Sequence, residues 1–273
     1  MSTFPFAASV IISFVYLLIA VLFVIVFYTS RPGFHRVARG LIYLNLVLHV
    51  AFVVYSGILE GRVPLTSAFQ VISFLTLIVA LLYVFLENRM RAESLGTFVF
   101  PLIFVLQAVS LFGGGIVPMD MEILETPLVG FHIVTSVIGY CAFVYSMVLG
   151  VMYLYLFHSL KRKKLKKIYD QLPPLEILER MNGASQIGGL IFLTFGIVTG
   201  AANAQAEWNA IPISDPKIYL TFLLFVFYLG GVILKYVLGW GGKRMAYVAI
   251  LGFCFLAAAF VVANFILPTI HRF

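Results

Sequence analysis

The chain has 273 residues, of which 62% are hydrophobic and only 11% are charged. Charged residues make up about a quarter of an ordinary soluble domain, so this composition excludes one. The formal net charge is +7, and in so apolar a chain the position of the basic residues along the sequence is the informative property. Cys141 and Cys254 both lie in apolar segments, where we expect core thiols and no disulfide. The sequence has no C-x-x-C-H motif, so the chain is not itself a c-type cytochrome.

Apolar stretches follow one another along nearly the whole chain. A helix needs roughly 20 apolar residues to cross the hydrocarbon core of a bilayer. The sequence therefore predicts an all-α integral membrane protein, a bundle of about eight transmembrane helices that forms a single domain over 1–273. We expect the first stretch to be a retained span, because the residues before it carry no Lys or Arg. The predicted spans are 7–29, 41–59, 67–86, 95–112, 128–157, 184–204, 217–238 and 245–267.

The charges of the loops predict the orientation of this bundle. Lys and Arg are enriched in cytoplasmic loops, and in this chain they fall in alternate loops, whereas the loops between them are acidic or neutral. Both termini are therefore predicted on the outer, periplasmic side of a bacterial cytoplasmic (inner) membrane. The basic residues are Arg31, Arg36 and Arg39, then Arg89 and Arg91, then the run from Lys161 to Lys167, then Lys243 and Arg244.

Two loops are candidates for roles of their own. The cytoplasmic loop 158–183 carries the basic run, which is either a topology anchor or a surface for anionic lipid or a soluble partner. The outer loop 205–217 contains Trp208 and ends with Asp215-Pro216-Lys217. We expect the lipid bilayer to be a partner of the chain, and we expect no nucleic-acid partner.

Gly196 and Gly200 form a G-x-x-x-G pattern in span 184–204. Small residues at this spacing let two helices approach closely inside a membrane. The pattern predicts close packing in the bundle and needs no cofactor to explain it.

Three histidines are predicted away from the outer face of the bundle. His35 and His158 are placed at the cytoplasmic interface, where we expect solvated imidazoles. His49 lies near the middle of span 41–59, a depth at which an ionisable residue faces the bundle interior or a cavity. It is either a neutral histidine bonded to a neighbouring helix or part of a cofactor site or pathway.

His132 and His271 are predicted at the outer face. His132 lies about one turn inside span 128–157, and His271 follows the end of span 245–267. The topology therefore places both imidazoles at the same face and depth of the membrane. Two neutral imidazoles on different helices can ligate one haem iron axially.

Several blocks of the chain resemble the cytochrome c assembly protein family, the membrane haem-handling proteins of the CcsA/ResC type and the similar HemX-like proteins. Residues 61–70 are similar to the family's G-x-x-P-L-S-N-x-Y-E segment, and His132 to Tyr140 resembles its histidine-bearing fifth span. Further similar blocks are 172–178, Gly188-Gly189, 194–200 and the ending from Asn264 to Phe273.

The outer loop resembles the family's tryptophan-rich loop, W-G-x-Y-W-x-W-D-P-K-E, in a degenerate form. Trp208 and Asp215-Pro216-Lys217 stand at the family's spacing. Asn209, Pro212, Ser214 and Ile218 replace the Gly, the two further Trp and the Glu of this loop. The seventh span has Ile233 where CcsA-type proteins carry a further histidine, as HemX-like members do.

The resemblance implies a membrane protein that binds haem b and transports or presents it at the outer face during cytochrome c assembly. It implies His132 and His271 as iron ligands, with Trp208, Asp215 and Lys217 around the haem. Arg272 and Arg62, like Lys217, are candidates to neutralise haem propionates. It also implies a membrane partner with an outer soluble domain, and a chain that is not catalytic alone but at most part of a haem-attachment complex.

Two other functions stay open. The chain is alternatively a b-type haem electron-transfer subunit of a membrane redox complex, in which His49 serves a second haem or a quinone. As a third alternative it is a HemX-like regulator of haem synthesis that acts through its basic cytoplasmic loop.

Overall fold

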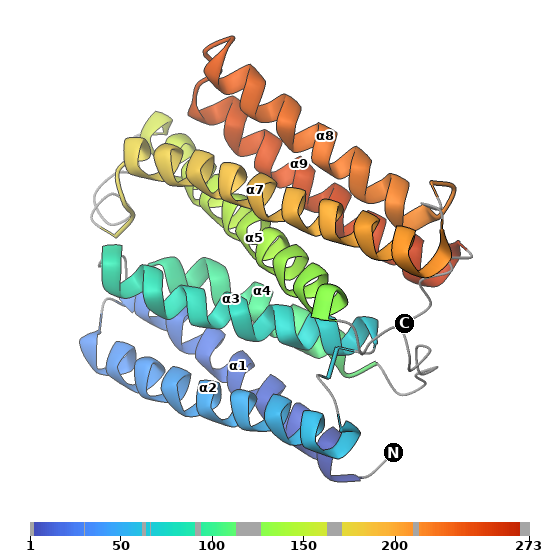
Figure 1. Ribbon diagram of the computed structural model, residues 1–273. Coiled ribbons are helices and arrows are strands. Elements are labelled where there is room, and N and C mark those ends of the chain that lie inside the picture. Colours follow the sequence, from blue (N-terminus) through green and yellow to red (C-terminus); the bar gives the residue numbers. More distant parts are fainter. Residues whose placement is uncertain are drawn as a thin grey trace. The chain divides into compact units, whose positions relative to one another are not determined.

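The computed structural model describes residues 3–29, 31–61, 64–65, 67–90, 94–112, 127–162, 171–209 and 213–267. Within these ranges every regular element is a helix (Figure 1). Seven of the described helices are long and apolar enough to cross a membrane, which confirms the predicted all-α, multi-pass membrane protein. The elements are α1 (Thr3–Thr29), α2 (Pro32–Glu60), α3 (Ala68–Met90), α4 (Leu95–Ser110), α5 (Pro127–Lys161), α7 (Leu175–Trp208), α8 (Pro216–Tyr236), α9 (Gly242–Val261) and a π-helical turn, η2 (Val262–Ile266).

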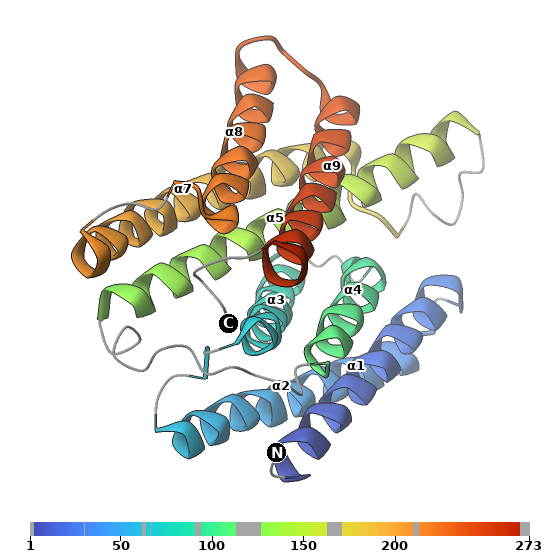
Figure 2. The ribbon, with the colours of Figure 1, turned by 90° about the vertical axis from the view of Figure 1, so that its right-hand side faces the viewer.

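The helices pack as two compact units, and the single domain over 1–273 stays a prediction. Unit 1 is Met1–Ile116 with Asp170–Leu172, and unit 2 is Val117–Tyr169 with Pro173–Phe273. In unit 1, α1 packs against α2 and α4, and α3 packs against α2 and α4. In unit 2, α5 lies along α7 and also contacts α9, and α8 packs against α7 and α9 (Figures 1 and 2). Each unit thus has its own set of helix contacts.

Several helices begin earlier than their predicted spans. α2 begins at Pro32. Proline suits the first helical position, because the N–H that it lacks would have no partner within the helix there. α7 begins at Leu175, directly after its N-cap residue Pro174. The basic and outer loops are therefore shorter than the predicted 158–183 and 205–217, since helices occupy their ends.

α4 differs from the other helices in length. Its 16 residues correspond to about 24 Å, which is less than the roughly 30 Å of the hydrocarbon core. The predicted span 95–112 is therefore a shorter apolar helix, enclosed in unit 1 by contacts with α1 and α3.

A chain of hydrogen bonds joins the four helices of unit 1 in its interior. The His49 ring on α2 is fully buried, with Nδ1 3.0 Å from the Tyr16 hydroxyl of α1 and Nε2 3.0 Å from the Ser73 hydroxyl of α3. Ser73 is 3.3 Å from the side-chain oxygen of Gln107 on α4, and the Gln107 amide donates to Ser9 of α1 at 3.3 Å. Unpaired polar groups are costly at this depth, so the chain of bonds fixes how the four helices meet.

His35 is buried, although the sequence predicted a solvated interfacial residue. Its Nε2 lies 3.1 Å from Glu87 of α3, and its ring meets Phe23 edge-on with centroids 5.9 Å apart. Arg39 approaches the other Glu87 oxygen at 3.7 Å. The difference arises because α2 starts at Pro32, which places His35 inside the first turn of the helix and against α1 and α3.

We predict that His49→Leu destabilises unit 1. Leucine leaves the buried hydroxyls of Tyr16 and Ser73 without the imidazole, at a cost of about 1–3 kcal/mol. The free energy of unfolding in mixed detergent micelles measures this loss, and Val47→Leu on the exposed face of α2 is the matched control. Adding Tyr16→Phe to His49→Leu should restore part of the loss, since both partners are then apolar. Strictly additive losses would show that the two side chains are not coupled.

Candidate functional site

His132 is anchored to α7 by a hydrogen bond to the backbone. The ring lies near the beginning of α5, and its Nδ1 is 2.7 Å from the carbonyl oxygen of Gly196. A carbonyl oxygen only accepts hydrogen bonds, so Nδ1 carries the proton. In a neutral imidazole the lone pair is then on Nε2. This arrangement, with a backbone carbonyl orienting the ring through one nitrogen, is typical of histidines that ligate metals through the other.

The G-x-x-x-G motif of α7 makes the space that the His132 ring occupies. A Cβ on Gly200 would come within 3 Å of ring atoms Cε1 and Nδ1 of His132. A Cβ on Gly196 would meet the hydroxyl of Ser136, one turn further along α5. The predicted close helix packing is therefore present, and both glycines face α5. The sequence showed the motif and the histidine but not that they meet.

Asp215 begins α8 as its N-cap. Its carboxylate accepts a hydrogen bond from the backbone N–H of Lys217 at 2.9 Å, Pro216 takes the first helical turn, and the Asp215 side chain is buried. The backbone N–H groups of Ile218 and Tyr219 donate to the Asp215 carbonyl oxygen. The Asp-Pro-Lys segment is thus a helix-start signal, with Lys217 half-buried beside the cap.

The structure describes only some of the other residues predicted at this face. Trp208 is the last residue of α7, and Asn209 ends the helix with a left-handed φ of 50°. Its N–H donates to the carbonyl oxygen of Gln205. His271, Arg272 and Arg62 lie outside the described residues.

Helix direction brings the predicted outer residues of unit 2 to one end. α5 and α7 run antiparallel, since His132 near the start of α5 meets Gly196 and Gly200 near the end of α7. Figures 1 and 2 show the start of α5, the end of α7 and the start of α8 at the same end of unit 2. His132, Trp208, Asp215 and Lys217 therefore lie at one end of unit 2, and its assignment to the outer membrane face stays a prediction.

His49 is held within unit 1. Both of its ring nitrogens are engaged with hydroxyl groups, so an iron would have to displace Tyr16 or Ser73. Its predicted cofactor role stays a prediction that the geometry does not favour. Among the described residues there is also no group of three or more His, Cys, Asp or Glu side chains that could hold a bare metal ion.

A π-helical turn, which the sequence did not predict, follows α9. The Leu267 N–H donates to the carbonyl of Val262 at 3.0 Å, and the Asn264 amide donates to Phe260 at 2.8 Å. Single π turns are frequent at functional sites. This turn lies a few residues before His271 in the chain.

Comparison with known proteins gives consistent matches. The family model described as cytochrome C assembly protein matches residues 65–271, which ends on the predicted ligand His271. A Guillardia theta protein named cytochrome c biogenesis protein CcsA is 26% identical, with 78% of this chain and 77% of that protein covered. Proteins of the same name from Heterosigma akashiwo, 24% identical (77% and 76% covered), and Prochlorococcus marinus strain AS9601, 20% identical (79% and 77%), are also similar.

We predict that Gly200→Ala displaces the His132 ring. The new methyl group would overlap Cε1 and Nδ1, so the bond to Gly196 must lengthen or break at a cost of about 1 kcal/mol. Gly188→Ala on the same helix is the matched control, because its Cβ meets nothing within 4 Å among the described atoms. Imidazole nitrogen NMR shifts of His132 and the thermal midpoint should change in the first variant. An unchanged His132 spectrum in Gly200→Ala would contradict the packing described above.

Proposed function

Because the chain belongs to the cytochrome c assembly protein family, we propose that it binds haem b at the outer membrane face and transports or presents it there. A role in cytochrome c biogenesis follows from the family itself. The haem cargo, its ligands and the side of the membrane are our proposal. The orientation of the His132 ring is its main support.

His132 has the properties that an axial haem ligand needs. Its Nδ1–H is fixed on the Gly196 carbonyl, which places the basic lone pair on Nε2. The ring lies against Gly196 and Gly200 of α7. We propose His271 as the second ligand, since it follows α9 at the same predicted face.

The other residues of this face are proposed to contact the rest of the haem. Lys217 at the start of α8, with Arg272 and Arg62, would pair with the propionates through charge-assisted hydrogen bonds. Trp208 would offer a flat aromatic surface. Asp215 would contribute indirectly. Its carboxylate accepts a hydrogen bond from the backbone N–H of Lys217 at the start of α8, and this bond would hold Lys217 at this end of the helix.

The chain needs help to attach haem to a protein. The protein that receives the haem would carry the C-x-x-C-H motif. From the family membership, and not from any residue of this chain, we propose a membrane partner with an outer soluble domain. We propose that this chain is not catalytic alone and is at most part of a haem-attachment complex. We place the complex in a bacterial cytoplasmic membrane, which the similarity to the Prochlorococcus marinus proteins supports.

We predict that the purified protein binds haem and that His132→Ala and His271→Ala each weaken binding more than about tenfold. Oxidised and reduced absorption spectra during titration with haem b measure the affinity and the axial ligation. The matched control is His158→Ala, which removes a histidine of the same helix whose Nδ1 also bonds a backbone carbonyl, that of Leu154. This variant should bind haem like the unmodified chain.

The same spectra separate the alternatives. Easily lost haem at low occupancy is expected for a handling protein, and tightly held, reversibly reducible haem would identify an electron-transfer subunit instead. Haem that binds unchanged in both histidine variants would refute the ligand assignment. A chain with no haem binding, but with a haem-synthesis defect on changing Lys161 to Lys167, would identify a regulator.

A further inference from the structure

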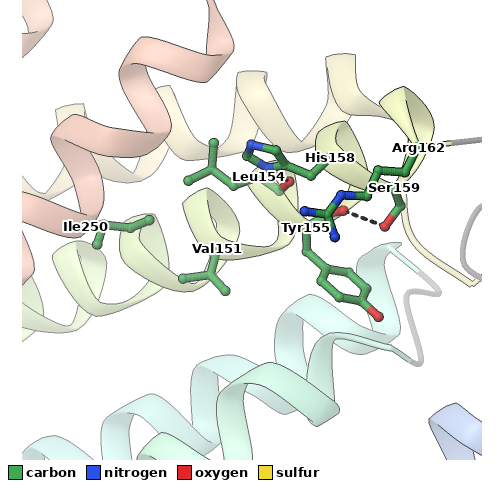
Figure 3. Close-up of a pocket in the computed structure, with 7 residues that line it drawn as sticks. All are labelled: Val151, Leu154, Tyr155, His158, Ser159, Arg162 and Ile250. Carbon is green, nitrogen blue, oxygen red and sulfur yellow. Dashed lines mark hydrogen bonds between the residues drawn. The ribbon is translucent and has the colours of Figure 1, made fainter.

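A cavity of about 480 Å³ lies at the basic end of α5, outside the site proposed for haem. Its wall on α5 ends with the last described turn of that helix, and Ile250 of α9 lines it from the neighbouring helix (Figure 3). All lining residues belong to unit 2. They are Val151, Leu154, Tyr155, His158, Ser159, Arg162 and Ile250.

The α5 residues of this cavity form one stripe that changes from apolar to polar. Their positions recur every three or four residues, so they share one face of the helix. Figure 3 shows Val151 and Leu154 further from the end of α5 than His158, Ser159 and Arg162, and we call the first group the apolar part and the second group the rim. From Val151 to Arg162 the stripe rises by about 16 Å. A phospholipid has its surfaces in the same order, with an apolar acyl chain followed by a polar headgroup.

The length of α5 places the rim at headgroup depth. Its 35 residues correspond to about 52 Å, well over the roughly 30 Å of the hydrocarbon core. The apolar part of the stripe then lies inside the core and its last two turns lie in the interfacial region. The loop charges assign this end to the cytoplasmic leaflet.

The rim is positively charged. Arg162 offers a planar guanidinium with five N–H donors, and Lys161 precedes it. The Lys243 ammonium of α9 lies 5.5 Å from the centre of the Phe157 ring, which brings a further cation to the same end of α5. His158 and Ser159 donate to the carbonyls of Leu154 and Tyr155 on their own helix, at 2.7 and 2.8 Å. Arg162 is therefore the main donor to an anion at this rim.

We propose that this cavity binds one anionic phospholipid, with the phosphate at Arg162 and an acyl chain against Val151, Leu154 and Ile250. Charge at the rim selects an anionic over a zwitterionic headgroup. The apolar part selects a lipid over free phosphate, since phosphate gains nothing from that surface. The site is independent of haem binding and would tie unit 2 to the acidic leaflet.

Lipid titration of the purified full chain, followed by native mass spectrometry in neutral detergent, tests this proposal. Phosphatidylglycerol should bind at one copy per chain with a preference over phosphatidylcholine of about fivefold or more. Arg162→Gln should lower that preference about fivefold. Val151→Trp should block the apolar part and remove binding of both lipids at this site. Inorganic phosphate should not compete at equal concentration.

The matched control is Arg244→Gln. It removes the same charge near the same end, but the Arg244 guanidinium lies over the Trp240 ring, 5.3 Å from its centre, and does not line the cavity. If Arg244→Gln leaves the preference for phosphatidylglycerol unchanged, the preference comes from Arg162 at this cavity. Equal losses in Arg162→Gln and Arg244→Gln would mean a diffuse basic surface and overturn the proposal. Haem that displaces the lipid, with an absorption band lost in His158→Ala, would also overturn it by making the cavity a haem site.

Discussion

The close approach of α5 to α7 is the constraint on which the rest of unit 2 depends. In a bilayer, lipid tails solvate apolar side chains as well as another helix does, so helices associate through tight packing and hydrogen bonds. A Cβ on Gly139 of α5 would lie 3.1 Å from the backbone nitrogen of Leu193 and 3.2 Å from the Gly189 carbonyl oxygen. Only glycine at such positions lets two backbones come this near. The same nearness brings the Gly196 carbonyl within reach of His132, so the packing that holds the helices together also orients the proposed ligand.

Both units combine buried polar contacts with close aromatic packing. Unit 1 joins its four helices through buried hydroxyl, imidazole and amide groups around His49, and it stacks Phe23 on Phe100 with centroids 5.3 Å apart. Unit 2 adds close glycine contacts to the stacking of Phe143 and Tyr228, 3.8 Å between centroids, and its buried Asn182 amide donates to the Ser146 carbonyl of α5 at 3.1 Å. A polar chain tolerates few substitutions, because each member leaves a partner unsatisfied. Glycine packing is equally restrictive, because any side chain adds volume at a backbone contact.

The apolar stretches predicted the membrane class, which the helices confirm. Helix ends were predicted less well. Apolar composition marks the hydrocarbon core, whereas α2, α5 and α7 continue beyond it into polar segments. The buried state of His35 was missed for this reason. The division into two units and the meeting of His132 with Gly196 depend on contacts between distant segments, which no local pattern contains. The π turn at Val262–Ile266 likewise has no composition signal.

The cap formed by Asp215 has a consequence for genetics. A residue that starts a helix is required for the amount of folded protein in the membrane, whatever cargo the protein carries. In a screen for strains that lack cytochrome c, changes at Asp215 would therefore be recovered through reduced abundance. If the proposed function holds, changes at His132 would be recovered through a protein that is present but binds no haem. Immunoblotting beside the screen would sort the two classes. Asp215, which the sequence motif marks clearly, therefore has a role in folding that does not depend on haem binding.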